Sequence, residues 1–110
     1  MEAGFVKVAE KYELTTEKVK AVKVGGNDVL LTNVDGVFYA ISLKCTHMGG
    51  DFSKGQLEGK IVTCPRHHAQ FDVTTGKVVS HPKMALLHPK AKDAKTYEVK
   101  VENDNIMIKT

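Results

Sequence analysis

A chain of 110 residues with a net charge of +3 is long enough to bury a core as one domain, without disulfide staples. Its hydrophobic fraction of 42% and charged fraction of 26% are typical of globular proteins and exclude a disordered chain. No apolar run approaches the roughly 18 residues that a membrane span needs, and the first ten residues lack the apolar segment of a signal peptide. We therefore expect a cytoplasmic protein that does not bind membranes.

The positive charge comes almost wholly from lysine, because Arg66 is the only arginine. Nucleic-acid readers rely on arginine and on clustered aromatic residues, so nucleic-acid binding is not expected. Scattered surface lysines serve solvation, or steer an acidic protein partner. The chain has two cysteines, and in a reducing compartment they favour a metal or redox role over a disulfide.

The first third of the chain is predicted to form an antiparallel meander. Residues 17–24 alternate charged and apolar side chains, and residues 29–34 and 37–42 are two further apolar runs. A Gly-Gly-Asn-Asp stretch separates the first two segments, and the hairpin dipeptide Asp35-Gly36 separates the last two.

The middle of the chain is predicted to be a small loop-rich insertion on this β scaffold. Short strand-like pieces at residues 56–64 and 71–79 are broken by glycines, which permit tight loops and close backbone approach. Residues 80–95 contain two prolines and no clear period, so we expect a long loop with a short helical turn at residues 84–87.

The C-terminal residues are predicted to form a second hairpin. Tyr97, Val99 and Val101 fall on one face of a strand with a period of two residues. Residues 103–105 form the turn, and residues 106–108 return as the partner strand. The C-terminus is therefore expected to be another hairpin.

Two short motifs carry the metal chemistry. Cys45 and His47 are separated by one residue, Cys64 and His67 by two, and sixteen residues lie between His47 and Cys64. Two hairpin-like loops would bring these four side chains to one point. Thiolate is a strong ligand for iron or zinc, and neutral imidazole changes the charge and potential of whatever is bound. The alternative, that both cysteines are ordinary buried thiols, does not account for the joint spacing.

The two motifs together resemble the signature of the Rieske-type ferredoxin family. The resemblance covers CTHMGG (residues 45–50) and CPRHHAQFDVTTG (residues 64–76), and it includes the spacing, the ligand order, Pro65 and the downstream F-x-x-x-T-G. It implies one 2Fe-2S cluster, with Cys45 and Cys64 on the inner iron and His47 and His67 on the outer iron. His68 is expected to face solvent and not to be a ligand, and His81 and His88 to be surface residues.

The family resemblance also implies a fold. We expect an all-β protein with a Rieske-like antiparallel β-sandwich or barrel as its base. A small loop-rich cluster-binding subdomain at about residues 43–82 would be set into a base formed by residues 1–42 and 83–110. Phe71 is expected to fill the core beneath the second loop.

Departures from the high-potential branch of the family concern four positions. Gly50 and Arg66 stand where that branch carries a disulfide, and Ala69 and Phe71 stand where it places hydroxyls that donate to sulfur. Hydrogen bonds to sulfur favour the reduced state and raise the potential. Their absence predicts a low potential, roughly between −200 and −50 mV, near the bottom of the Rieske range.

The resemblance implies a monomeric one-electron carrier that accepts electrons from a reductase and passes them to a terminal oxygenase or another oxidoreductase. No enzyme active site is expected, because 110 residues leave no room for a second domain with mononuclear iron. Two alternatives stay open on the sequence: a structural zinc domain and a cluster-bearing redox sensor. The one-residue gap between Cys45 and His47 argues against zinc, which prefers wider ligand spacing.

Overall fold

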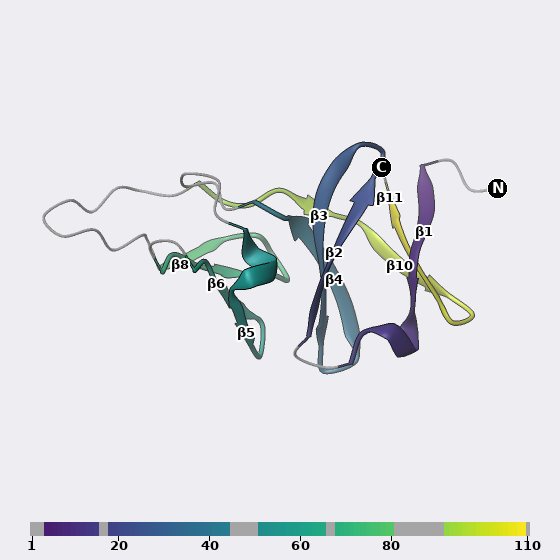
Figure 1. The fold of residues 1–110 in the computed structure, drawn as a ribbon, viewed down its shortest axis with the longest axis horizontal. Helices are drawn as coiled ribbons and strands as arrows, with labels where there is room; N and C mark the ends of the chain where they lie inside the picture. Colours follow the sequence, from purple (N-terminus) through teal and green to yellow (C-terminus); the bar gives the residue numbers. More distant parts are fainter. Residues whose placement is uncertain (1–3, 16–17, 45–50, 66–67, 81–91, 110) are drawn as a thin grey trace, which may run out of the picture.

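The computed structural model describes residues 4–15, 18–44, 51–65, 68–80 and 92–109. These residues form three antiparallel sheets and two short 3-10 helices, η1 (Lys11–Glu13) and η2 (Phe52–Lys54) (Figure 1). The strands are β1 (Phe5–Glu10), β2 (Val19–Val24), β3 (Asn27–Val34), β4 (Val37–Ser42), β5 (Gln56–Glu58), β6 (Ile61–Thr63), β7 (Gln70–Asp72), β8 (Val78–Ser80), β9 (Thr96–Tyr97), β10 (Val99–Glu102) and β11 (Asn105–Lys109). The predicted all-β antiparallel fold is confirmed. No described helix has the length and apolar character needed to cross a membrane.

The predicted meander forms the first base sheet, in the order β2-β3-β4-β9. Asp35 and Gly36 connect β3 to β4 with φ angles of 51° and 88°. A two-residue hairpin with both φ values positive matches the twist of its flanking strands, which is why this dipeptide closes it. The predicted hairpin turn is therefore confirmed, and β9 adds a short fourth strand beside β4.

The second base sheet joins the two ends of the chain, in the order β1-β11-β10. Strand β1 was not anticipated from the sequence; it pairs antiparallel with β11 from Phe5 opposite Lys109 to Glu10 opposite Asn105. The predicted turn before β11 is confirmed, with Asn103 at a φ of 56°.

The single strand expected through Tyr97, Val99 and Val101 is wrong. Tyr97 pairs with Ala40 of the first base sheet, whereas Val99 pairs with Ile108 of the second. The chain therefore passes between sheets at Glu98, which ends one ladder and precedes the next. A local period of two residues cannot show such a change of partner.

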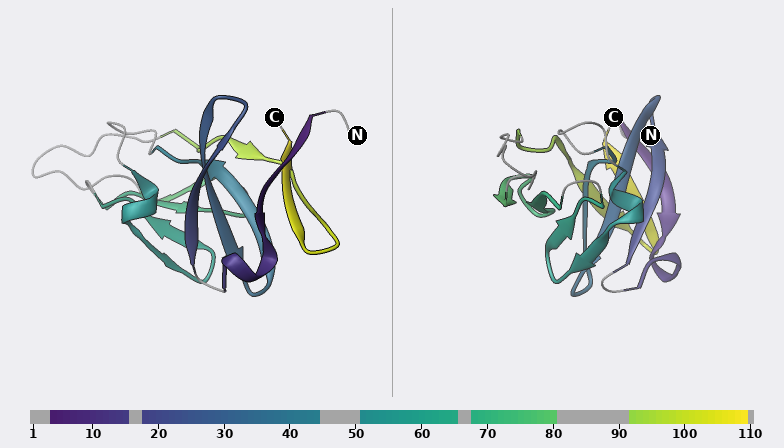
Figure 2. Two further views of the ribbon diagram at one scale, coloured as in Figure 1. Left: turned by 45° about the vertical axis from the view of Figure 1, so that its right-hand side comes forward. Right: turned by 60° about the vertical axis from the view of Figure 1, so that its left-hand side comes forward.

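The third sheet, in the order β5-β6-β7-β8, lies beside the base, on the side away from β1, β10 and β11 (Figure 2). Each of its strands is three residues long. It lies next to η2. This helix begins directly after Asp51, which forms an isolated β-bridge with Lys44. The helical turn expected at residues 84–87 lies outside the described residues.

Two clusters of buried side chains hold these sheets together. One fills the space between the two base sheets, and the other joins the base to the third sheet. The first contains Ala9, Leu14, Val24, Val29, Leu31, Phe38, Ala40, Ile106 and Ile108. The second contains Leu30, Ile41, Leu43, Phe52, Leu57, Val62, Cys64, Ala69, Phe71, Val73 and Ala94. Strand β3 thus contributes alternate residues to the two clusters, because successive side chains point to opposite faces.

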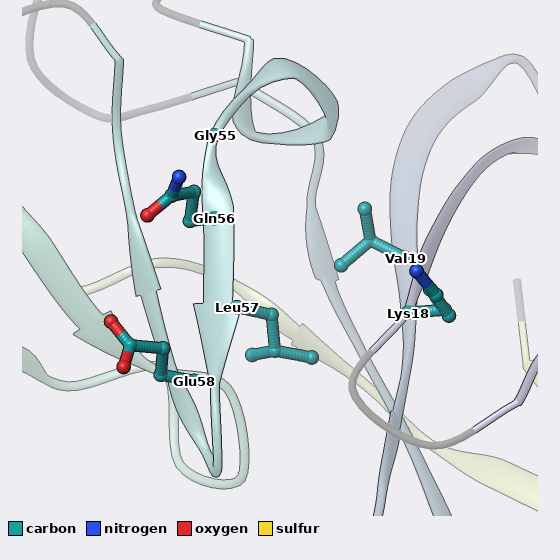
Figure 3. A pocket seen from close by; sticks show the side chains of 6 residues that line it. All are labelled: Lys18, Val19, Gly55, Gln56, Leu57 and Glu58. Carbon is teal, nitrogen blue, oxygen red and sulfur yellow. The ribbon is translucent and has the colours of Figure 1, made fainter.

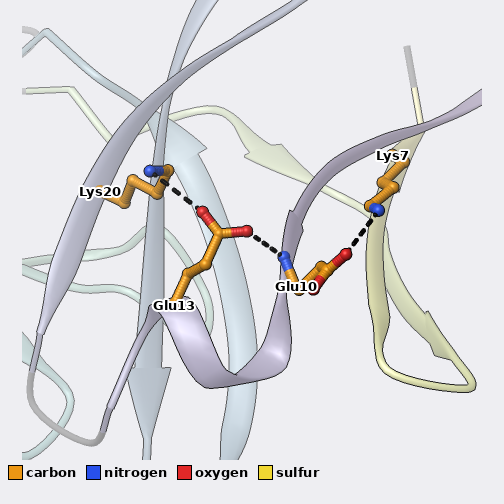
Figure 4. A network of polar contacts seen from close by, with 4 residues as sticks. All are labelled: Lys7, Glu10, Glu13 and Lys20. Carbon is orange, nitrogen blue, oxygen red and sulfur yellow. Dashed lines mark hydrogen bonds and ion pairs between the residues drawn. The ribbon is translucent and has the colours of Figure 1, made fainter.

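Polar contacts fix the start of the base. The carboxylate of Glu13 accepts from the backbone N–H of Glu10 at 2.8 Å and lies 3.6 Å from the ammonium of Lys20 (Figure 4). Glu10 is in turn paired with Lys7 at 3.0 Å, so β1, η1 and β2 are linked at the surface. Deeper in the base, buried Asn33 donates to the carbonyl of Leu14 at 2.8 Å.

Candidate metal centre

Of the four predicted ligands, Cys64 is the one that lies within the described residues; Cys45, His47 and His67 fall outside them. Cys64 follows β6 directly and is only 1% exposed. Its thiol is free and belongs to the apolar cluster that joins the base to the third sheet. The third sheet therefore presents a buried, uncommitted sulfur at one end of a strand.

The hairpin loop after Cys64 is held at both ends by backbone hydrogen bonds. The N–H of Cys64 donates to the carbonyl of Ala69 at 2.8 Å, and the N–H of His68 donates to the carbonyl of Cys64 at 3.2 Å. Below them, the side-chain amide of Gln70 donates to the hydroxyl of Thr63 at 3.2 Å. His68 is exposed and takes a φ of 63°, so the predicted solvent-facing position of His68 is confirmed.

The segment that leads into η2 is fixed against the same region. The N–H of Phe52 donates to the carbonyl of Leu43 at 2.9 Å, and the ring of Phe52 meets Phe71 edge-on at 5.1 Å between centroids. Asp51 accepts from the backbone N–H and the hydroxyl of Ser53, at 2.8 and 2.6 Å. The prediction that Phe71 fills the core beneath the second loop is confirmed, since its side chain is fully buried.

Hydrogen bonding keeps the Asp51 carboxyl ionised. The hydroxyl of Ser53 lowers the pKa of Asp51; burial opposes this, and the Ser53 N–H and the charges of Lys54 and Lys44 lower it further. The net pKa lies below the ordinary value of 3.8. At neutral pH this carboxylate therefore acts as the cap of η2.

A pocket of about 350 Å³ opens over Cys64. Its lining comes from the end of η2, the start of β5 and the loop after β6: Lys54, Gly55, Gln56, Thr63, Cys64, Pro65 and His68. A Cβ at Gly55 would overlap the carbonyl oxygen of Thr63 and lie 3.3 Å from the ring of Pro65. Only glycine therefore allows η2 and β5 to pack this closely against the loop.

Lys54 and Gln56 were not singled out by the sequence motifs, because they lie eight or more residues before Cys64. Gly55, which lies between Lys54 and Gln56, was the available signal, because the glycines of this segment were expected to permit close approach of the backbone. In the parts of the chain that the structure describes, no group of three or more His, Cys, Asp or Glu side chains comes together, at Cys64 or at any other place. Cys64 and its pocket are the candidate centre.

The chain matches the model of the Rieske [2Fe-2S] domain family over residues 4–106. It belongs to this family. The Rieske domain is 45% identical over 91 residues to the ferredoxin component of the naphthalene 1,2-dioxygenase/salicylate 5-hydroxylase systems of Ralstonia sp, a match that covers 83% of this chain and 81% of the relative.

Solved structures agree with this assignment. The Rieske domain superposes on the ferredoxin of carbazole 1,9a-dioxygenase from Nocardioides aromaticivorans IC177 with a TM-score of 0.84 and 28% identity, covering 97% of this chain and 98% of that one. It also matches a chain in the complex of reduced oxygenase and oxidized ferredoxin in carbazole 1,9a-dioxygenase, with a TM-score of 0.81 and 26% identity, over 98% of this chain and 94% of that one. The Rieske domain is therefore an electron-transfer protein with one 2Fe-2S cluster, and not a catalyst by itself.

The chemistry at Cys64 fits such a cluster. A free thiol supplies the thiolate that iron–sulfur clusters require, and the apolar side chains around it limit access of water. Two neighbours in the Rieske domain, Ala69 and Phe71, are buried and carry no hydroxyl. Neither side chain can donate a hydrogen bond to sulfur.

A groove of about 350 Å³ lies between the base and the third sheet of the Rieske domain. It lies between Lys18 and Val19 of the base and residues 55–58 (Figure 3). Leu57 points across the groove toward Val19, whereas Gln56 and Glu58 point away from it (Figure 3). Cysteine and histidine are absent from its lining, so this groove offers packing between sheets and no soft metal ligand.

Proposed function

We propose that Cys45, His47, Cys64 and His67 hold the 2Fe-2S cluster. The observation that carries this assignment is Cys64: a free thiol, 1% exposed, that lines an open pocket at the end of the third sheet. The bridge between Lys44 and Asp51 supports it, because it pairs the two residues that flank the segment of the sequence with Cys45 and His47. Thiolate and imidazole together are the donor set of a Rieske centre.

The proposed role is one-electron transfer from a reductase to a terminal oxygenase. The cluster, when bound, supplies the reversible one-electron chemistry. Ferredoxin components of dioxygenase systems are relatives of this chain, and a ferredoxin–oxygenase complex contains a chain of the same fold. The protein's own contribution is to bury Cys64 among apolar side chains directly after β6.

The proposal assigns different roles to two parts of the chain. Residues 43–82 bind the cluster, and residues 1–42 and 83–110 form the base. Support for this division comes from the third sheet, whose strands all fall between Gln56 and Ser80 and, within the described residues, pair only with one another. We propose that the protein works as a monomer in the cytoplasm, where its thiols stay reduced until they bind iron.

A low reduction potential also belongs to the proposal. Ala69 is 1% exposed and Phe71 is fully buried, so apolar groups occupy these positions beside Cys64. Without hydroxyl donors at these sites, the more negative reduced state is stabilised less. We expect a potential of roughly −200 to −50 mV, near the lower end for Rieske centres. Introduction of a donor by Phe71→Tyr should raise it.

Electron paramagnetic resonance tests the ligand assignment. The protein is purified without oxygen, its visible spectrum is recorded, and it is reduced with dithionite. We expect a signal from a cluster with mixed histidine and cysteine ligation. Cys64→Ser and His67→Ala should each lose it, whereas His68→Ala, a neighbouring histidine with an exposed side chain, should keep it.

Other results would change the conclusion in distinct ways. Cluster absorption that survives in both Cys64→Ser and His67→Ala would refute the ligands. A colourless protein that contains zinc would favour the structural metal domain. A reduced protein that fails to pass electrons to any oxygenase or other acceptor would favour redox sensing.

A further inference from the structure

The pocket that Cys64 lines has a lysine in its wall and no carboxylate. Lys54 is exposed, and the lining contains no other lysine, no arginine and no Asp or Glu side chain. Lys54 occupies the last turn of η2, at the entrance to β5. An anionic group that entered this pocket would meet an ammonium without passing a carboxylate in the lining.

Three carboxylates of the η2 segment and of the third-sheet region are engaged by donors other than Lys54. Asp51 accepts two hydrogen bonds from Ser53, and Asp72 accepts two from Thr74, at 2.8 and 2.6 Å, and lies 3.4 Å from the ammonium of Lys60. Asp93 accepts from the backbone N–H of Val78 at 3.0 Å. These carboxylates satisfy local backbone and hydroxyl donors, so their charges do not form ion pairs with Lys54.

The ammonium of Lys54 is available to a partner. Among the described residues, no hydrogen bond or ion pair occupies its side chain, although its charge helps to lower the pKa of Asp51. Lys44 adds a second positive charge near the same carboxylate. Lys54 therefore brings a positive charge to the lining of the pocket that Cys64 also lines.

We propose that an acidic side chain of the redox partner protein docks against Lys54 at the rim of this pocket, outside the space that the cluster takes. The proposal rests on the proposed function, because it places the partner beside the cluster that Cys64 holds. A carboxylate beside an ammonium forms a charge-assisted hydrogen bond, about twice as strong as a neutral one. Opposite charges also speed the encounter of two proteins in a salt-dependent manner. The partner's surface is therefore acidic at the point of electron exchange.

A fluorescently labelled hexaglutamate peptide tests the charge preference. Its binding to the cluster-loaded protein is followed by fluorescence anisotropy at low and at moderate salt. Lys54→Gln should weaken binding about threefold to tenfold, and Lys54→Glu should weaken it further. The matched controls are Lys11→Gln and Lys11→Glu, which change an exposed lysine of η1, on the far side of the base. These should have much smaller effects.

A second readout tests electron exchange at the same pocket. Voltammetry on a gold electrode coated with carboxylate-terminated chains measures the rate at which one electron passes between the cluster and an acidic surface. Lys54→Gln should slow this rate, and Lys11→Gln should not. On amine-terminated chains the difference between the two variants should disappear.

Three outcomes would overturn the docking proposal. The first is that the Lys54 and Lys11 changes weaken hexaglutamate binding equally. The second is that the unaltered protein does not bind hexaglutamate at low salt. The third is that a labelled oligonucleotide binds more tightly than hexaglutamate and depends on Lys54, which would indicate a phosphate site. The visible spectrum separates these from failure of the proposed function. If a variant keeps its cluster absorption, its binding result bears on docking alone; if the unaltered protein has no cluster, the proposed function fails first.

Discussion

The base and the third sheet reach stability in different ways. Strand β3 of the base is eight residues long and buries five consecutive residues from Val29 to Asn33. Strands β5, β6 and β7 are three residues long, and each buries only its central residue, respectively Leu57, Val62 and Phe71. Long ladders support the base, whereas the third sheet depends on loop hydrogen bonds and on a core that it shares with Leu30 and Ile41 of the base.

This difference indicates how the two regions respond to damage. Loss of packing between the base sheets should lower the stability of the whole molecule. Loss of packing beneath Cys64 should release the cluster before the base unfolds, because local regions with few buried contacts open at lower free energy. Four sets of variants test this expectation, beginning with the largest effect.

Removal of one buried ring from each region gives the strongest test. Phe71→Ala and Phe38→Ala should each cost about 3–5 kcal/mol, since both rings are buried. Denaturant titrations are followed by visible absorbance for the cluster and by far-ultraviolet circular dichroism for the sheets. In Phe71→Ala the absorbance should fall at lower denaturant than the dichroism; in Phe38→Ala the two should fall together. Coincident transitions in Phe71→Ala would contradict the comparison.

Two glycines with positive φ separate backbone strain from close packing. Gly76 has a φ of 79°, and a Cβ there would overlap the carbonyl oxygen of Ala94; Gly36 has a φ of 88° and open space around it. Gly36→Ala should cost about 1–2 kcal/mol from conformation alone. Gly76→Ala should cost more, because it also separates the turn before β8 from Ala94. Equal losses of stability in the two variants, measured by thermal unfolding, would show that the backbone at Ala94 moves readily to make room for the added Cβ.

Acid should weaken the third sheet through Asp72. Burial raises the pKa of this carboxyl, but hydrogen bonds from Thr74 and the nearby Lys60 outweigh it, and the pKa lies below its ordinary value of 3.8. The ionised form is therefore favoured by folding. Its contribution is fully present above pH 3.8 and is lost as the pH falls toward the lower, folded pKa.

The variant Asp72→Asn should remove this acid-dependent contribution. The difference in melting temperature between the unaltered protein and Asp72→Asn should be largest near pH 6 and should shrink below pH 3.8. Asp28→Asn serves as the control, since the side chain of Asp28 forms an exposed ion pair with Lys23 at 3.8 Å. A difference that stays constant with pH would show that the Asp72 effect is not electrostatic.

The smallest effect is expected at the surface of the base. Lys20→Gln removes an ion pair with Glu13 whose two side chains are 40% and 38% exposed. Such a pair should contribute less than about 1 kcal/mol, and high salt should reduce it further. Chemical denaturation at two salt concentrations measures this. A larger loss would indicate that Lys20 helps to hold η1 against β2.

The sequence predicts local features of the fold better than distant pairings. The Asp35-Gly36 hairpin could be predicted because a two-residue turn is specified by its own residues. The pairing of β1 with β11 could not, because it joins residues about a hundred positions apart. The change of sheet at Glu98 could not be predicted either, because side chains alternate in the same way whichever sheet a strand joins.

The candidate site shows a similar limit. The spacing of Cys45, His47, Cys64 and His67 predicts a ligand set that stays a prediction, whereas the predicted burial of Phe71 is confirmed. The position of Lys54 in the lining of the pocket could not be predicted, because it depends on how closely Gly55 approaches the carbonyl of Thr63. Contact between two backbone segments is a property of three-dimensional packing, which short motifs do not encode.

Pairing between β1 and β11 also affects the order in which the chain folds during synthesis. Until residues 105–109 have left the ribosome, β1 lacks its partner β11, and the hydrogen bonds between these two strands cannot form. Strands β5 to β8, in contrast, pair only with close neighbours in the sequence and can associate as soon as they emerge. Contacts between distant residues form slowly because a long loop must close first. The nascent chain therefore assembles the region around Cys64 early and closes its second base sheet last.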